Sequence, residues 1–263
     1  MTKAIRVHNT GGPEVMTLED VEVGQPGAGE VRVRHTAIGL NFIDVYFRTG
    51  AYPVQTPFTP GFEAAGVVEA VGDGVNNLSV GDRIAYAAQP IGAYAEERLI
   101  AADRLVKLPD EIADRVGAAI MLKGMTTEYL LRRTYAISAG DTILFHAAAG
   151  GVGLIACQWA SHLGATVIGT VGSEEKADLA REHGCHHTII YTREDFVEQV
   201  KEITDGKGVN VVYDAVGKDT FLKGFDCLQP LGTMVLFGAS SGAPDPINPA
   251  PVSYTHLTLP TKA

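Results

Sequence analysis

The sequence has 263 residues, of which 46% are hydrophobic and 20% are charged, and its formal net charge is −10. This composition is typical of a soluble globular chain with one large or two ordinary domains, and the absence of a Lys or Arg cluster argues against nucleic acid or an anionic membrane surface as a partner. No stretch reaches the uninterrupted apolar length of a membrane helix, and the N-terminus lacks the apolar core of a signal peptide.

Residues 1 to about 120 are predicted to be rich in β-strands. Short apolar stretches alternate there with turns rich in glycine and proline, as in a small barrel or sandwich. The expected strands are 4–8, 16–23, 30–38, 61–72, 83–88, 92–100 and 105–108. From Asp114 onward apolar residues recur at three-and-four spacing, which predicts helices over 116–122 and 126–135.

From Thr142 onward strands and helices alternate, which predicts a parallel sheet with helices on both faces. The expected strands are 142–148, 166–171, 188–191, 209–216 and 232–239, and the expected helices are 152–163, 174–183, 194–204 and 220–228. A complete sheet of this kind has six strands, and the four prolines between Ser240 and Pro251 are incompatible with a central strand. We therefore expect a C-terminally truncated chain with a foreign tail.

The first expected strand of this second half runs into a turn of small residues, Ala148-Ala-Gly-Gly-Val-Gly153, and then into a helix. A helix start that offers free N–H groups and the positive end of its dipole suits a pyrophosphate. Ala148 stands where a G-x-G-x-x-G motif has its first glycine. Taken alone, the turn fits a structural strand–helix connection equally well.

Cysteine and histidine usage gives no sign of a metal or a thiol nucleophile. Cys157, Cys185 and Cys227 form no CxxC motif, which favours a reducing, cytoplasmic compartment and small core residues. The eight histidines show no metal-ligand spacing. We interpret His146, just before the glycine turn, as a structural strand residue.

Four motifs in the chain resemble the medium-chain dehydrogenase/reductase superfamily, and within it the zinc-free NADPH:quinone oxidoreductases, the zeta-crystallin-like group. They are residues 37–46, 61–66, 80–83 and 147–153. The resemblance implies a GroES-like β-barrel catalytic domain in residues 1–124 and a Rossmann NADP-binding domain with a doubly wound parallel sheet in 125–241. It also implies that the last sheet strand and the returning C-terminal segment are missing, and we expect residues 242–263 to be an irregular tail.

The same resemblance allows a test for zinc. Zinc alcohol dehydrogenases of the superfamily have Cys-x-x-Asp where this chain has Asn41-Phe-Ile-Asp44, and Gly-His-Glu where it has Gly61-Phe-Glu63. Two of the three protein ligands of a catalytic zinc are therefore replaced, and the four-cysteine structural lobe is absent because no Cys precedes Cys157. We expect no metal and no alcohol dehydrogenation.

The cofactor type is predicted from the end of the second strand of the sheet. An NAD site has an acidic residue there, whereas this chain has Gly172-Ser173 followed by Lys176. A hydroxyl and a cation suit a 2′-phosphate, so NADPH is favoured over NADH. The resemblance places Tyr191 on that phosphate. Glu174 and Glu175 complicate this interpretation, although acidic residues at a helix start also favour its dipole.

The resemblance implies further cofactor contacts at the nicotinamide, the pyrophosphate and the strand ends. They are Asn41, Lys123, Thr126, Gly150, Gly151, Val152, Val216, Gly217, Phe237 and Gly238. For Phe237, plain core packing is an equal alternative.

The acceptor site is expected to include Asn41, Ile43, Asp44, Tyr46 and Tyr52, with Asn41, Asp44, Tyr46 and Tyr52 as the catalytic set. The two tyrosines offer flat apolar faces and hydroxyl donors, which fit a quinone ring. Alternatively they are ordinary loop aromatics, and Asp44 is a helix cap or a partner of Arg48. Either tyrosine, or water, would deliver the proton.

These observations together predict an NADPH-dependent reductase that transfers a hydride to quinones without zinc. One alternative is an enone or enoyl-thioester reductase of the same superfamily, and another is a non-catalytic, crystallin-like NADPH-binding protein. The expected partner is a small-molecule quinone or enone, with no nucleic acid and no membrane. An intact family member is expected to form a homodimer. The truncated chain is expected to be poorly soluble or not cleanly dimeric, because the 232–239 strand would be an exposed edge, and an inactive chain is a further alternative that follows from the truncation.

Overall fold

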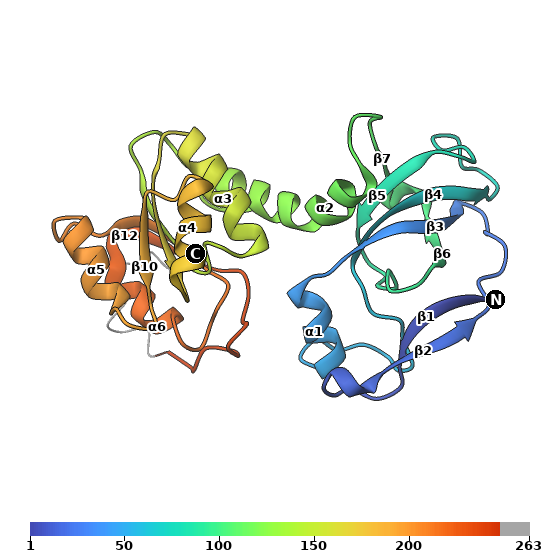
Figure 1. Ribbon diagram of the computed structural model, residues 1–263, viewed down its shortest axis with the longest axis horizontal. Helices are drawn as coiled ribbons and strands as arrows, with labels where there is room; N and C mark the ends of the chain where they lie inside the picture. The colour runs from blue at the N-terminus through green and yellow to red at the C-terminus, as the bar shows by residue number, and fades with distance from the viewer. Residues whose placement is uncertain (248–263) are drawn as a thin grey trace, which may run out of the picture. The chain divides into compact units, whose positions relative to one another are not determined.

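The computed structural model describes residues 1–247. The chain forms two compact units, residues 1–125 and the part from Thr126 onward, which are described separately. The first unit contains antiparallel sheets and the second a parallel sheet (Figure 1). Each unit therefore has the sheet type expected from the sequence, and the mixed fold class is confirmed.

The first unit is built on a five-stranded antiparallel sheet in the order β6-β3-β4-β5-β7. Its strands are β3 (Glu30–Gly39), β4 (Glu63–Val71), β5 (Arg83–Ala87), β6 (Glu97–Ala101) and β7 (Val106–Lys107). Strands β1 (Thr2–Val7) and β2 (Met16–Val21) form a separate antiparallel pair. Short 3₁₀ turns, η1 (Pro13–Val15) and η2 (Ala102–Arg104), connect strands. The inward-facing Val33, Val68, Ile84 and Tyr86 are fully buried and form the core of this sheet.

Helix α1 (Phe42–Thr49) was not expected from the sequence, which we had interpreted in this region as a motif only. Its start is fixed by Asp44, whose carboxylate accepts the Asn41 N–H at 3.0 Å. Its end is fixed by Gly50, which has a φ of 81° and donates its N–H to the Phe47 carbonyl. An acidic residue three positions after Asn and a glycine after the last turn are ordinary helix boundary signals.

The two helices expected over 116–122 and 126–135 are one helix, α2 (Asp114–Tyr129). Gly124 does not interrupt it, because a single glycine lowers helix stability by only about 1 kcal/mol. A wider turn, η3 (Leu130–Thr134), follows, and there the Tyr135 N–H bonds to the Leu130 carbonyl, five residues back.

The second unit contains a parallel sheet in the order β10-β9-β8-β11-β12. The strands are β8 (Thr142–Phe145), β9 (Thr166–Val171), β10 (His187–Ile190), β11 (Val209–Asp214) and β12 (Leu228–Leu236). The helices are α3 (Gly151–His162), α4 (Glu174–Glu182), α5 (Phe196–Ile203) and the short α6 (Phe221–Gly224), which continues as the 3₁₀ turn η4 (Phe225–Cys227). The alternation expected from the sequence is confirmed.

Helices cover both faces of this sheet (Figure 1). Ala156 and Ala160 of α3 and Ala177 of α4 are buried in the core on one face. Phe196 and Val200 of α5 are buried on the other face. The chain leaves the central strand β8 outward to β10 and then crosses back to β11, so the order reverses between β8 and β11, where such folds bind ligands.

Several boundaries in this unit differ from expectation, three of them for reasons visible in the backbone. Strand β8 ends at Phe145 rather than at residue 148, because Ala147 adopts a φ of 56° and starts the turn. Strand β12 begins at Leu228, and Leu231 within it has a φ of 63°. The predicted helix over 220–228 is only one turn long before it tightens to 3₁₀. Most of the expected irregular tail, 248–263, lies outside the described residues.

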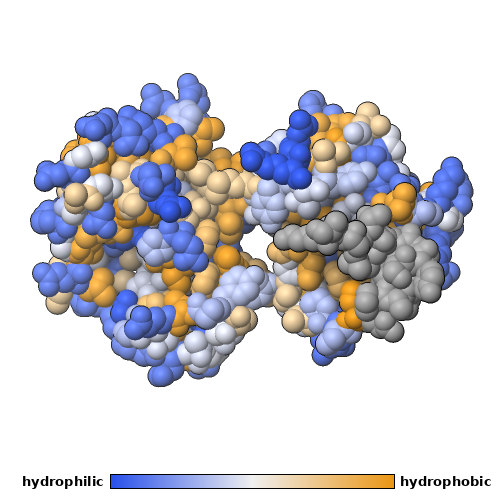
Figure 2. All heavy atoms as spheres, turned by 180° about the vertical axis from the view of Figure 1, so that it is seen from behind, coloured by the Kyte–Doolittle hydropathy of each residue, from blue (hydrophilic) through white to orange (hydrophobic). Residues whose placement is uncertain are grey.

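All three cysteines are buried, as predicted for small core residues. No helix within residues 1–247 is long and apolar enough to cross a membrane. Figure 2 shows hydrophilic and hydrophobic residues interspersed over the visible face.

Candidate active site and nucleotide cavity

The glycine turn lies between the end of β8 and the start of α3, as the motif predicts. A Cβ on Gly153 would lie 2.4 Å from the Ala147 carbonyl oxygen and 2.5 Å from that of Ala148, so only glycine lets the helix pack on the turn. Ala148, which replaces the first glycine of the motif, is fully buried. Its methyl group fits because β9 has Gly169 beside it, where a Cβ would lie 2.5 Å away.

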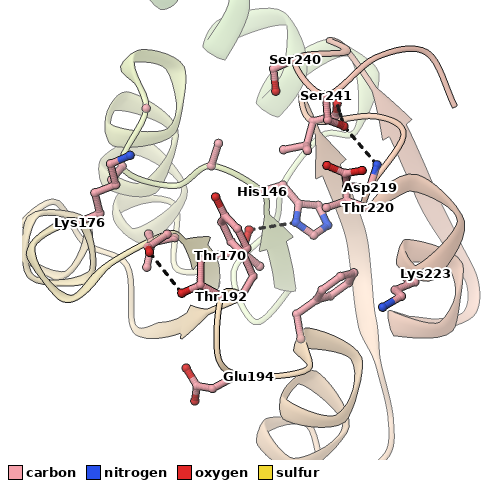
Figure 3. Close-up of a pocket in the computed structure, with 18 of the residues that line it drawn as sticks. His146, Thr170, Lys176, Thr192, Glu194, Asp219, Thr220, Lys223, Ser240 and Ser241 are labelled. Atoms are coloured by element: carbon pink, nitrogen blue, oxygen red, sulfur yellow. Dashed lines mark hydrogen bonds between the residues drawn. The ribbon is translucent and has the colours of Figure 1, made fainter.

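A cavity of about 750 Å³ opens at the carboxyl ends of β8, β9, β10 and β11. Five of the residues predicted to bind the cofactor line it: Gly150, Gly172, Lys176, Tyr191 and Val216. The cavity also has residues that the sequence analysis did not assign to a site, among them His146, Thr170, Thr192, Arg193, Asp219, Thr220, Lys223 and Ser241 (Figure 3). Most of them follow strand ends, which is the only signal the sequence offered for them, whereas Thr170 lies within β9 and Lys223 within α6.

At one end of the cavity the loop after β9 and the loop after β10 are joined. Tyr191 lies over Gly172, where a Cβ would be 3.0 Å from its hydroxyl oxygen, and the Thr192 hydroxyl donates to the Gly172 carbonyl at 3.3 Å. Ser173 is the N-cap of α4, and its hydroxyl oxygen accepts the Lys176 N–H at 3.4 Å. Ser173 thus orients the helix start from which Lys176 projects.

His146 is fully buried in the wall of this cavity. Its Nδ1 lies 3.0 Å from the Thr170 hydroxyl, and its ring meets Phe196 edge-to-face at a centroid distance of 5.0 Å. Its Nε2 has no hydrogen-bond partner among residues 1–247. Burial lowers the pKa of His146 to about 4, against a smaller opposing effect of Asp214, so the ring is neutral at pH 7.

Asp214, at the end of β11, organises the loop that follows. This fully buried carboxylate accepts the N–H groups of Val216 and Gly217 at 2.6 and 3.0 Å and the Thr220 hydroxyl at 2.7 Å. Gly217 has a φ of 89°, which favours glycine at this turn. Val216 and Thr220 are thereby fixed in the cavity wall.

The remaining predicted cofactor residues occupy varied positions. Gly151 and Val152 form the first turn of α3, and Thr126 lies on α2. Phe237 contacts Phe145 at a centroid distance of 5.7 Å, so the core packing considered for it is observed. At Gly238 a Cβ would lie 2.9 Å from the Ala215 carbonyl oxygen, so a side chain there would crowd the end of β11.

In the first unit, Asn41 and Lys123 meet at a buried carboxylate. The Glu63 side chain is fully buried, and its two oxygens accept from the Leu122 N–H at 2.8 Å and from the Asn41 amide at 2.8 Å. The Lys123 ammonium lies 3.2 Å from Glu63 Oε2 and 2.7 Å from Asn41 Oδ1.

This donor set does not fit a catalytic zinc. Of positions 41, 62 and 63, only Glu63 offers a ligand that zinc prefers, and its carboxylate is already bound by an amide, a backbone N–H and an ammonium. No group of three metal-ligating side chains occurs within residues 1–247.

Tyr46 and Tyr52 belong to one aromatic cluster on α1 and the turn after it. Their ring centroids are 5.1 Å apart, and Phe42 and Phe47 contact one tyrosine each. Tyr52 is 43% exposed. The cluster therefore combines aromatic faces with an accessible hydroxyl.

Asp44 is buried and caps α1, which is one of the two roles considered for it. It accepts the Tyr94 hydroxyl at 3.0 Å in addition to the Asn41 N–H, and burial raises the pKa of its carboxyl. Arg48, the other partner considered, donates to the Gly11 carbonyl at 3.3 Å.

Two family models match the chain: the alcohol dehydrogenase GroES-like domain over residues 27–110 and the zinc-binding dehydrogenase over residues 151–261. A quinone oxidoreductase from Pseudomonas aeruginosa is 53% identical, with 99% of this chain and 82% of that protein aligned. A 2-haloacrylate reductase from Burkholderia sp is also 53% identical, over 94% and 76%. The crystal structure of Escherichia coli quinone oxidoreductase complexed with NADPH matches with a TM-score of 0.94 and 48% identity, covering 98% of this chain and 81% of that one.

Proposed function

Because the chain belongs to the quinone oxidoreductases of the medium-chain dehydrogenase/reductase superfamily, the zeta-crystallin-like group, we propose that it is an NADPH-dependent reductase of quinones that works without a metal ion. The observation that carries the proposal is the cavity at the strand ends, which is lined by Gly150 of the glycine turn and by Lys176 and Tyr191. Residues 1–124 would then form the substrate domain and 125–241 the NADP-binding domain.

NADPH fits the residues present. The tight glycine turn gives a pyrophosphate close access to the backbone N–H groups of Gly151 and Val152 at the start of α3. Lys176 and Tyr191 offer a cation and a hydroxyl for a 2′-phosphate. When bound, the cofactor supplies the hydride.

On the acceptor side, Tyr46 and Tyr52 would bind a quinone through their aromatic faces. A quinone that has accepted a hydride is an anion and needs a proton. The exposed hydroxyl of Tyr52, or water beside it, would donate that proton. Asn41 would be held in one orientation by Glu63 and Lys123, so it is a pre-organised polar group on this side.

The chemistry of a quinone also makes a metal unnecessary. A quinone is already electron-poor and needs no Lewis acid to polarise it, unlike an alcohol, whose oxidation in zinc enzymes begins at a metal-bound oxygen. The amide, ammonium and carboxylate at Asn41, Lys123 and Glu63 are consistent with such chemistry.

The test is a fluorescence titration with NADPH and NADH, followed by quinone-dependent oxidation of NADPH. We expect saturable binding that favours NADPH, and turnover with small quinones such as 1,4-benzoquinone. Folded protein that binds neither nucleotide would refute the proposal. Tight NADPH binding without turnover of any quinone or enone would instead favour a non-catalytic role.

A second candidate acceptor is an activated alkene, because the 2-haloacrylate reductase is as similar to this chain as the quinone oxidoreductase from Pseudomonas aeruginosa. Parallel assays with 2-chloroacrylate, methyl vinyl ketone and 1,4-benzoquinone at one NADPH concentration separate the two. A kcat/KM for the alkenes at least ten times that for the quinone would assign the chain to alkene reduction.

A further inference from the structure

The loop after β9 and the loop after β10 are linked by an ion pair between Glu174 and Arg193, which the sequence analysis did not anticipate. Glu174 is the first residue of α4, and Arg193 follows Tyr191 and Thr192 in the wall of the cavity. Both side chains are more than half exposed, at 59% and 58%. An ion pair this exposed contributes little to stability, so either side chain can leave it for another charged partner at little cost in free energy.

The charges at this end of the cavity do not favour an anion without Arg193. Glu174 and Glu175 contribute two negative charges at the start of α4, and Lys176 contributes one positive charge. Glu174, Glu175 and Lys176 together carry a net charge of −1, which would repel a phosphate dianion beside them. Arg193 adds a second positive charge and pairs with Glu174, while Glu194, which also lines the cavity, accepts the Ile190 N–H.

Among the cavity-lining residues within 1–247, Arg193 is the one on this side that can add a second cation. Among the lining residues that the structure describes, the other basic side chains are Lys176 and Lys223. Figure 3 shows Lys176 and Lys223 on opposite sides of the cavity, with Thr192 on the side of Lys176. Arg193 follows Thr192 directly and is tied to the start of α4 through Glu174.

We infer that Arg193 is a specificity-determining residue that binds the 2′-phosphate of the adenosine half of the cofactor, and that Glu174 is the counter-ion it exchanges for that phosphate. The inference rests on the proposed NADPH-dependent function. A guanidinium can hold a phosphate through two parallel N–H bonds, whereas the exposed pair with Glu174 is made through one nitrogen only. In the free protein Glu174 holds Arg193 at the place where the phosphate would arrive.

The decisive comparison is between R193Q and E174Q. We expect R193Q to lower the ratio of NADPH to NADH affinity about tenfold, because a bidentate, charge-assisted contact is lost. We expect E174Q to raise the same ratio about threefold, because the competing carboxylate is removed. If the pair served only to hold the two loops together, both variants would lower the ratio.

The measurements are dissociation constants for NADPH, NADH and 2′,5′-ADP, determined by fluorescence and calorimetry on the full chain. R193K keeps the charge but not the forked geometry and is expected to fall between wild type and R193Q. K201Q removes one positive charge from an exposed pair on α5 and controls for the change in net charge, so its ratio should equal that of wild type.

These measurements distinguish a failure of the proposed function from a failure of the assignment of Arg193. Wild-type protein that binds no nucleotide would refute the proposed function and this inference together. Wild-type protein that prefers NADPH, with R193Q unchanged or with both variants lowering the ratio, would overturn only the assignment of Arg193.

Discussion

The Lys123 ammonium and the Glu63 carboxylate form an ion pair at 3.2 Å in which the carboxylate is fully buried and the lysine side chain is 21% exposed. Burying a carboxylate destabilises the folded state unless a cation or several hydrogen bonds offset its loss of hydration. This pair therefore contributes to the stability of the first unit as well as to the orientation of Asn41.

We predict that K123M destabilises the protein by about 3 kcal/mol, because Glu63 then stays buried without its cation. The K123M/E63Q double variant should recover most of that loss, because it removes the unpaired charge. Urea unfolding measures both. Substituting Lys201 of the exposed Lys201–Glu198 pair should change stability by less than about 0.5 kcal/mol. Equal losses in the single and double variants would contradict the prediction.

Gly153 is predicted to tolerate no side chain. Its Cβ would meet two carbonyl oxygens at 2.4 and 2.5 Å, so G153A should cost at least about 2 kcal/mol of stability and displace the turn at which the pyrophosphate would bind. We expect thermal unfolding and NADPH titration to report both losses. G124A, whose Cβ would meet only a side-chain atom of Ile120 at 3.3 Å, should leave stability within about 1 kcal/mol of wild type.

Tyr52 is predicted to act on the acceptor and not on the nucleotide. Y52L removes the aromatic face and should raise the quinone KM about tenfold, which corresponds to about 1.4 kcal/mol of binding. Y52F keeps the face and loses the hydroxyl, so it should lower kcat if that hydroxyl is the proton donor and leave it unchanged if water is. Initial rates over a range of quinone concentrations separate KM from kcat. A Y52L variant with wild-type quinone KM would exclude Tyr52 from the acceptor site.

The buried His146 and the half-buried His35 predict acid sensitivity. Burial lowers the pKa of His146, and of His35, which lies between the Ala95 carbonyl and the Tyr86 hydroxyl, to about 4. The unfolded chain binds these protons near pH 6.5, so folding stability should fall as the pH drops from about 6.5 toward 4, by up to about 3 kcal/mol for each histidine.

Urea unfolding at pH 7.5, 6 and 5 tests this. The free energy of unfolding should depend less steeply on pH in H146N, because this variant lacks the histidine that stays neutral in the folded protein. H162Q, at an exposed position on α3, should follow the wild-type curve. A wild-type stability that is constant from pH 7.5 to 5 would show that these histidines are not held neutral.

The sequence predicted the parallel sheet well because each of its strands is a short apolar run followed by a helix with its own periodicity. It missed α1 because an eight-residue helix inside a β-rich region gives too short a pattern, although Asn41, Asp44 and Gly50 are boundary signals that could have located it. The sequence-based prediction divided α2 near Gly124, because glycine has a low helix propensity. The packed helix continues through this residue without a break.

The alternating pattern of strands and helices also located part of the candidate site. Residues next to the glycine turn and at the strand ends, such as Gly150 and Lys176, could be located from their position in the alternating pattern. Arg193 and His146 could not, because their role depends on partners that are distant in sequence: Glu174 for the first and Thr170 for the second. Ser173, expected to contact the phosphate, is also the N-cap of α4, a role that the sequence analysis did not assign to it.

The burial of Cys157, Cys185 and Cys227 affects whether an electrophilic acceptor can alkylate the protein. Quinones and 2-haloacrylates are electrophiles that alkylate accessible thiolates, and alkylation of a thiol beside an active site ends turnover. A chain that keeps all three of its thiols inside packed cores presents none of them to the acceptor. A thiol-reactive acceptor could therefore alkylate these cysteines only after the surrounding core has opened.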